Sequence, residues 1–389
     1  MLNKVLLFLV LSLACCHAFA YDLPEEFLKK TDQSVEAIYN LDFDKANKHI
    51  EELLEQSPNH PIALFGRVMI AWSRFEYQYE KSDPAQTEIF EQTIKASAKG
   101  IREYLEKTGP SAQAYLALGG VYGAKARFDL ANHNYVPAYF AARKGIKYMD
   151  RAHTLDPQMH DALLGQGLYQ YYTGTLPAVI KVLATLVARG NAQKGIEYLN
   201  QVKDNGRFAA AAAKLILVEI YLQSDKYYNP PLAARYTAEV MQKYPTNPLF
   251  GFVAIIAQYE NKEYDKALQA AGVFLSKVNK EKGYGDIYLA RAYTAIASIQ
   301  MAQDKFEEAV KTLEKSLEAT AHQPMTRWKL WNILRLAQSH DALQERQEAL
   351  KYYKQVIAEK PAWGIEDIAK PYLKNPFTPQ TPVGYMSPP

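Results

Sequence analysis

Cysteine is almost missing from this chain of 389 residues, since its two copies, Cys15 and Cys16, both lie near the N-terminus. If that N-terminal segment is removed on export, the mature chain contains no cysteine. Disulfides, thiolate metal sites and a cysteine nucleophile are then all excluded. A chain without free thiols also suits an oxidising compartment.

A large excess of one charge is also missing. The 45 basic and 42 acidic residues give a formal net charge of +3 and are mixed along the sequence. Nucleic-acid binders usually carry a clustered basic excess that neutralises phosphates. The basic run Lys277–Lys282 is short and contains Glu281, so it is typical of a solvated helix face. We therefore expect no nucleic-acid partner.

The usual motifs of catalysis and cofactor binding do not occur either. The sequence has no glycine-rich phosphate loop, no His-Glu-x-x-His pair and no Gly-x-Ser-x-Gly turn. His153 and His160 are separated by Pro157, which ends a helix, so they do not form one ligand face. Neighbouring acids such as Glu307 and Glu308 do not face each other on a helix. We expect no cofactor and no metal, and we predict that the protein is not an enzyme.

Residues 1–20 have the features of a signal peptide. Lys4 supplies the positive start, Val5–Ala14 is a short apolar run, and Ala18–Ala20 is a small-residue cleavage site. The mature chain would begin at Tyr21. The apolar run is too short for a membrane-spanning helix.

A second interpretation of the same segment is that Cys15 or Cys16 is lipidated at the mature N-terminus. The residues around them lack the small-residue context of a lipoprotein, so the signal peptide is favoured. Export to a periplasm is the leading expectation, with an outer-membrane lipoprotein or a secreted protein as the alternatives.

The chain is too long for one hydrophobic core, which stops growing at roughly 250–300 residues. It does contain a repeated pattern: a small residue, a bulky residue four positions later, an apolar or small residue three later, and proline five after that. Steps of four and three lie on one stripe of a helix, and proline ends the helix. Such helices must stack on further copies to bury the stripe. The pattern occurs in Ala46–Pro58, Gly145–Pro157, Ala233–Pro245 (with Thr237 as the bulky residue) and Ala349–Pro361.

Matching marks also occur in the predicted first helices of the repeats. Tyr115, Leu118, Gly119 and Tyr122 have the aromatic, leucine, glycine, tyrosine spacing of a tetratricopeptide first helix. At identical offsets after Pro58 and Pro157, the sequence reads Ala-Leu-Phe-Gly and Ala-Leu-Leu-Gly. These are the segments Ala63–Gly66 and Ala162–Gly165.

On these two patterns the chain resembles the tetratricopeptide repeat superfamily from about Glu25 to Pro361. The resemblance implies an all-α fold, a right-handed α-solenoid of degenerate tetratricopeptide helix pairs, which we assign to residues 21–373. It also implies that the first helices line a concave surface that binds a protein or peptide.

A weaker resemblance concerns an insert at about residues 174–190. Leu176-Pro177, the apolar run Ala178–Val187 and then Arg189-Gly190 are similar to a segment of the inclusion-body-clearance subfamily of tetratricopeptide proteins. The run is apolar on nearly every side apart from Lys181. We favour a buried plug, because large exposed apolar patches are uncommon on monomers. The alternative is an element that contacts a membrane surface or a partner.

The tail, residues 374–389, has a different composition. Five prolines lie between Asn375 and Pro389, among Thr, Gln and Ser. This composition predicts a disordered or extended segment without a packed element. A frayed terminus is favoured over a docking peptide, since chain ends are commonly loose.

Tyrosine is abundant, with 28 copies, and it suits both cores and partner surfaces. As partner-binding residues we select Arg67 and Gln166 on first helices, together with Tyr169 and Tyr172. The predicted function is a non-enzymatic scaffold or adaptor of the cell envelope that binds a protein or peptide. The alternative is a membrane-associated assembly or trafficking factor, held by Ala178–Val187 or by a lipidated cysteine.

Overall fold

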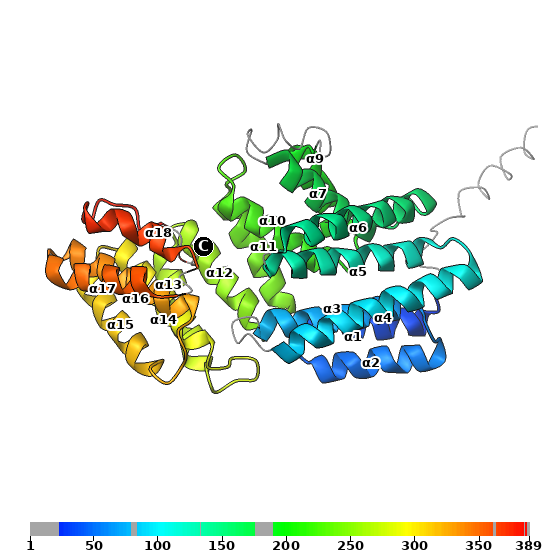
Figure 1. Cartoon of the computed structure of the whole chain (residues 1–389), viewed down its shortest axis with the longest axis horizontal. Helices are drawn as coiled ribbons and strands as arrows, with labels where there is room; N and C mark the ends of the chain where they lie inside the picture. Colours follow the sequence, from blue (N-terminus) through cyan, green and yellow to red (C-terminus); the bar gives the residue numbers. More distant parts are fainter. Residues whose placement is uncertain are drawn as a thin grey trace, which may run out of the picture. The chain divides into compact units, whose positions relative to one another are not determined.

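The computed structural model describes residues 23–78, 84–132, 134–175, 190–360, 363–384 and 386. Within these ranges the regular elements are helices, with no strand (Figure 1). The expected all-α fold is therefore confirmed. The segment 1–20 and the apolar run Ala178–Val187 lie outside the described residues. Of the helices inside them, none has both the length and the apolar character that a membrane crossing requires.

The helices follow one another as pairs, each made of a first and a second helix. The first helices are α1 (Glu25–Tyr39), α3 (Pro61–Gln78), α5 (Ala112–Ala131), α7 (Leu163–Thr175), α10 (Ala210–Gln223), α12 (Pro248–Glu260), α14 (Tyr288–Ala302) and α16 (Arg327–Ala342). The second helices are α2 (Phe43–Gln56), α4 (Pro84–Thr108), α6 (Tyr135–Leu155), α9 (Ala192–Asn205), α11 (Pro230–Lys243), α13 (Tyr264–Lys277), α15 (Phe306–Ala319) and α17 (Arg346–Ala358). The short elements are η2 (His160–Ala162), α18 (Ile365–Ala369) and η3 (Lys370–Leu373).

The chain forms two compact units, residues 1–217 and residues 218–389, with the boundary inside α10. In unit 1, first helix α5 packs against both α3 and α7. In unit 2, first helix α14 packs against both α12 and α16. Each unit is therefore an array in which neighbouring repeats contact each other through their first helices, as stacked repeats require.

The repeated stripes are buried as their spacing predicts. Ala46, Ile50 and Leu53 of α2 are almost fully buried, and the equivalent residues of α17 are fully buried. The glycines of the first helices explain how closely the pairs approach. A Cβ on Gly66 would lie 2.5 Å from Ile50 Cδ1, and one on Gly165 would lie 3.3 Å from Met149 Cγ. Both glycines thus meet the bulky residue of the preceding stripe, so the sequence repeat is also a packing repeat.

Four of the turns between a first and a second helix share a backbone geometry with a left-handed residue. Their central residues have positive φ: Leu41 (56°), Lys262 (58°), Asp304 (58°) and Gln344 (65°). In each turn the next residue donates its N–H to a carbonyl in the last turn of the first helix, as Asp42 N does to Ala37 O at 2.8 Å. None of the four is glycine, the residue that adopts this conformation at least cost.

A buried carboxylate orders the start of α10 within unit 1. Asp161 of η2 accepts the backbone N–H groups of Arg207, Phe208 and Ala209 at 3.0, 3.0 and 2.7 Å. The side chain of Arg207 in turn contacts Asp32 of α1 through Nη2 at 2.6 Å. Residues far apart in the sequence, in α1, η2 and the segment before α10, are thereby joined.

Residues 375–384 and Met386 are extended, one of the two states that the composition predicts, but they pack on the helices, whereas a frayed terminus was the favoured interpretation. Phe377 and Met386 are fully buried, and Phe377 packs among apolar residues that include Met301 and Leu336. The tail is extended apart from a turn in which Thr381 N donates to Thr378 O at 2.8 Å. Proline prevents a regular element here, but it does not prevent docking, because the folded helices supply the hydrogen-bond donors.

Candidate peptide-binding site

The tail lies on the first helices of unit 2, and the residues that hold it come from α12, α14 and α16. We call Tyr259, Met301, Trp331, Arg335 and Asp341 the tail-contact surface. Trp331, Arg335 and Gln338 are spaced four and three apart, so they lie on one stripe of α16. Nearly all of α16 is buried, including polar residues on this stripe. Neighbouring helices α14, α15 and α17 pack against α16, and the tail contacts Trp331 and Arg335 on this stripe.

Arg335 is the central residue of this surface. Its guanidinium stacks over the Trp331 ring, 4.8 Å from the ring centroid. Nη1 donates to Gln338 Oε1 at 2.9 Å and to the carbonyl oxygen of Val383 in the tail. Burial lowers the pKa of Arg335 to about 10, so the side chain remains protonated at neutral pH. A buried cation needs strong acceptors, and the tail carbonyl is one of them.

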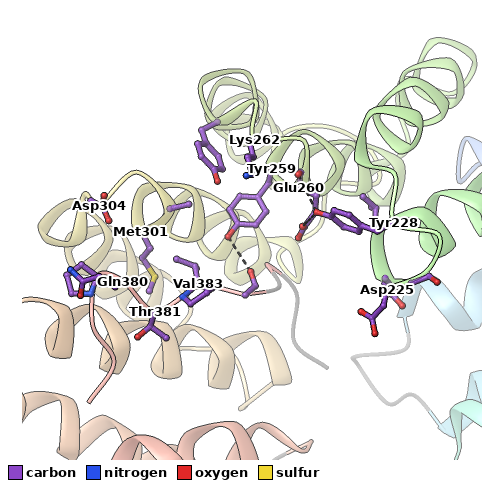
Figure 2. A pocket seen from close by; sticks show the side chains of 18 residues that line it. Asp225, Tyr228, Tyr259, Glu260, Lys262, Met301, Asp304, Gln380, Thr381 and Val383 are labelled. Carbon is purple, nitrogen blue, oxygen red and sulfur yellow. Dashed lines mark hydrogen bonds between the residues drawn. The ribbon is translucent and has the colours of Figure 1, made fainter. Parts of the chain in front are cut away.

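Two further donors bind tail carbonyls beside Arg335. Trp331 Nε1 donates to Met386 O at 3.0 Å. The Tyr259 hydroxyl donates to Gly384 O at 3.3 Å (Figure 2). Burial raises the pKa of Tyr259 to about 12, which keeps its hydroxyl proton in place for donation. The surface therefore recognises the tail mainly through main-chain oxygens, which every residue type provides.

The other end of the tail is fixed by Asp341. Its Oδ2 accepts the N–H of Phe377 at 2.9 Å, and both of its oxygens contact Arg346 Nη1 at 2.9 Å. The Asp341 side chain is fully buried, whereas that of Arg346 is about a quarter exposed, at 28%. The ring of Phe377 packs edge-on against Tyr372 and Phe306, with centroids 5.9 and 6.5 Å away. The tail is thus held by an apolar anchor at each end, with carbonyl contacts near the second anchor.

A pocket of about 650 Å³ lies beside the tail within unit 2 (Figure 2). Residues 379–384 of the tail form part of its wall. The remaining wall includes Tyr228, Tyr259, Glu260 and Lys262. Burial raises the pKa of Glu260, while a 2.9 Å hydrogen bond from the Tyr228 hydroxyl lowers it. No group of three His, Cys, Asp or Glu that could hold a metal occurs among the residues with a described position.

The four residues selected from the sequence all lie in unit 1. Arg67 on α3 makes two contacts with Glu51 of α2. Its Nε donates to Oε1 at 2.8 Å, and its Nη2 donates to Oε2. Gln166 on α7 donates to Asp150 Oδ1 of α6 at 2.8 Å. Both pairs are sixteen positions apart in the sequence. Arg67 and Gln166 therefore occupy equivalent places in two repeats and do not form one cluster.

The two selected tyrosines are on α7 with Gln166. Tyr169 is partly buried, and Tyr172 is 46% exposed with its ring edge-on to Tyr171 at 5.3 Å. Tyr172 thus remains accessible, as a partner-binding residue must be. No contact in the structure tests whether any of the four residues meets a partner, so their role stays a prediction.

Sequence reasoning missed the tail-contact surface because it treated the tail as loose. A signal was available, since the tail keeps Phe377 and Met386 among prolines and polar residues. Large apolar side chains in a segment that cannot form its own core indicate that the segment docks elsewhere. Trp331 and Arg335, four positions apart on α16, were the complementary signal.

One segment of the chain matches a known family. Residues 290–322, which include α15 and most of α14, match the family model described as a tetratricopeptide repeat. No curated protein matches the sequence.

Several solved structures are similar to this chain at low sequence identity. A Rap protein complexed with Competence and Sporulation Factor has 10% identity and a TM-score of 0.48, over 90% of this chain and 99% of that one. NprR in complex with its cognate peptide NprX has 13% identity and a TM-score of 0.44, over 91% and 84%. Yeast Tom70 has 13% identity and a TM-score of 0.41, over 87% and 86%.

Proposed function

We propose that this chain, which is a tetratricopeptide repeat protein, is a non-enzymatic interaction scaffold that holds a protein or peptide on its first helices. The observation that best supports the proposal is the tail on α12, α14 and α16. Three donors on those helices bind main-chain carbonyls, and the surface buries two apolar anchors. A surface that holds one extended segment in this way can hold another of similar chemistry.

Physical considerations favour binding over chemistry at this surface. Its polar groups are already used in positioning contacts, with Arg335 on Val383 O and Asp341 on Arg346 and Phe377 N. Large aromatic and arginine side chains are also the residues that dominate binding energy at interfaces. The same argument extends by repeat equivalence to the first helices of unit 1, where Arg67, Gln166, Tyr169 and Tyr172 remain our proposed contacts.

The place of action that we propose is the cell envelope, most simply a periplasm. The support is the leader-like sequence of residues 1–20 with its cleavage site before Tyr21. Mass spectrometry of the chain purified from the envelope of its own cell tests this. A mature N-terminus at Tyr21 is the expected result, and an acylated Cys15 or Cys16 would replace the proposal with an outer-membrane lipoprotein.

Site-specific photo-cross-linking tests the binding surface. A photoreactive residue is placed at Tyr172 in unit 1 or at Tyr228 beside the unit 2 pocket, which are 46% and 49% exposed. The matched controls are the second-helix residues Leu155 in unit 1 and Val273 in unit 2, each 51% exposed. Because the four residues are similarly exposed, a difference in cross-linking yield reflects where the partner binds and not how accessible the residue is.

The expected result is a discrete adduct at Tyr172 or Tyr228 that is absent from both controls. In unit 1 the adduct at Tyr172 should weaken when Arg67→Glu and Tyr169→Ala are combined. Equal yields at Tyr172 and Leu155, or adducts at the controls alone, would show that the first helices are the wrong surface. Tyr228, in the turn between α10 and α11, tests the pocket against Val273 in the same way.

A further inference from the structure

The tail-contact surface holds a segment of the chain itself, and its contacts define what else it accepts. We infer that residues 377–384 and Met386 are a resident substitute for the partner segment, which the partner displaces when it binds. The inference rests on the proposed function and adds the chemistry of the ligand. That ligand is an uncharged, extended segment that contains proline and carries two apolar anchors, spaced as Phe377 and Met386 are.

The structure separates the tail from the elements that must stay folded. Arg346 of α17 donates through Nη2 to the carbonyls of Tyr372 and Leu373, at 2.9 and 2.8 Å. These bonds fix the chain directly before the tail begins. Residues after 374 can therefore leave the surface while α17, α18 and η3 keep their own contacts.

Contacts with the tail are concentrated on carbonyls and on the two anchors. Between the anchors, Pro379, Gln380 and Pro382 are exposed. Proline lacks an N–H, but the tail N–H that the surface accepts is that of Phe377, on Asp341, so the prolines between the anchors cost no contact with the surface. A proline-containing segment also loses less conformational freedom on binding, since its extended form is preorganised.

Because the tail is part of the same chain, a partner must compete with it for the surface. A segment joined by a short linker competes as though it were present at an effective concentration of roughly millimolar. If the tail occupies the surface for about nine-tenths of the time or more, an incoming segment has its apparent dissociation constant raised roughly tenfold or more. Loosening the tail should therefore reveal affinity that the intact chain conceals.

The first experiment detects displacement without weakening any anchor. A spin label is attached at Gln380→Cys, an exposed tail position, in the chain from Tyr21, which has no other cysteine. The probe is a synthetic peptide of residues 375–389, with a scrambled peptide as the control. The mobile fraction of the label should rise with the added peptide and not with the scrambled one. An unchanged spectrum at millimolar peptide would overturn the inference.

The second experiment measures the concealed affinity. The labelled 375–389 peptide is titrated with the full chain that carries both Phe377→Ala and Met386→Ala. We expect binding roughly tenfold tighter than to the unaltered chain. Gln380→Ala, which alters the tail without removing an anchor, is the matched control and should bind like the unaltered chain. Equal binding by the two-anchor variant and the unaltered chain would contradict displacement.

A variant of the tail-contact surface tests whether the peptide binds the donors that hold the tail. Adding Trp331→Phe to the two-anchor variant removes one N–H donor and keeps an aromatic ring. It should weaken peptide binding by roughly fivefold, the loss expected for one net hydrogen bond. Undiminished binding would place the peptide somewhere other than the tail-contact surface and end the inference.

The outcomes distinguish this inference from the proposed function. A partner that cross-links to the first helices with the same yield whether or not the tail anchors are intact would sink the inference alone. Peptide-driven release of the tail without any first-helix adduct in the envelope would sink the proposed function, while the tail-contact surface would remain a segment-binding site.

Discussion

The first helices of the two units treat their polar side chains differently. In unit 1, Arg67 and Gln166 stay partly exposed, and each contacts a carboxylate of the preceding second helix. In unit 2, Arg335 is fully buried and contacts the carbonyl of Val383 in the tail. Whether a polar residue of a first helix is exposed or buried therefore depends on the group that it contacts and on what covers it.

The difference has an energetic consequence. Ion pairs that remain near solvent contribute little to stability, because water screens the charges and long side chains lose freedom when they are held. Removing one partner of a buried ion pair destabilises the fold much more, because the other charge stays buried without a partner. Substitutions at the tail-contact surface should therefore be far more destabilising than equivalent substitutions on the first helices of unit 1.

Asp341→Ala should have the largest effect. It removes the fully buried acceptor of both Arg346 Nη1 and Phe377 N. We expect a loss of about 3–5 kcal/mol in the free energy of unfolding, measured by urea denaturation. Glu348→Ala, which removes an exposed partner of Lys351 on α17, is the control and should change little. A loss below about 1 kcal/mol for Asp341→Ala, the range of exposed pairs, would erase the contrast between the units.

The second prediction concerns pH and is confined to unit 1. His60 packs on Phe27 with ring centroids 4.2 Å apart, and burial lowers its pKa from 6.5 to about 4. The folded state thus binds its proton less readily than the unfolded state. Stability is complete above pH 6.5 and falls as the pH drops from 6.5 toward 4, by up to about 3 kcal/mol.

Intrinsic fluorescence can follow each unit in that experiment. Trp72 is the tryptophan of unit 1, and Trp331 is among those of unit 2. Between pH 7 and pH 4.5 the urea midpoint reported by Trp72 should fall, and His60→Leu should remove much of that fall. An unaltered pH dependence in His60→Leu would assign the effect to other groups.

The sequence predicted the repeat but not what covers it. Ala46, Ile50 and Leu53 could be placed in the core because helical periodicity alone puts them on one stripe. Arg335 could not, since its burial depends on a segment about fifty positions away that forms no regular element. The positive φ of Leu41 was equally hidden, because local preference argues against that conformation for leucine and the packing of the pair overrides it.

The left-handed turns give a third prediction, which compares one turn from each unit. Leu41 in unit 1 and Gln344 in unit 2 have φ of 56° and 65°. Glycine adopts this conformation without a Cβ clash, and the relief of that clash outweighs the greater freedom of glycine in the unfolded state. Leu41→Gly and Gln344→Gly should therefore each stabilise the fold by about 0.5–1 kcal/mol. Thermal unfolding measures the gain, and Leu41→Ala, which keeps the Cβ, is the control. Destabilisation by both glycines would mean that the side chains contribute more than the strain.

The smallest effect should come from the residues that the sequence singled out. Arg67 and Glu51 are 40% and 39% exposed, so Arg67→Ala should cost only about 0.5 kcal/mol despite its two-point contact. Gln166→Ala, at the equivalent place in another repeat, should cost no more. A double-mutant cycle of Arg67→Ala with Glu51→Ala measures the pair directly. A coupling near that of a buried pair would show that unit 1 also uses its first-helix charges as structure. A small coupling energy would mean that Arg67 and Gln166 can exchange their intramolecular acceptors for those of a partner at little cost to the stability of the fold.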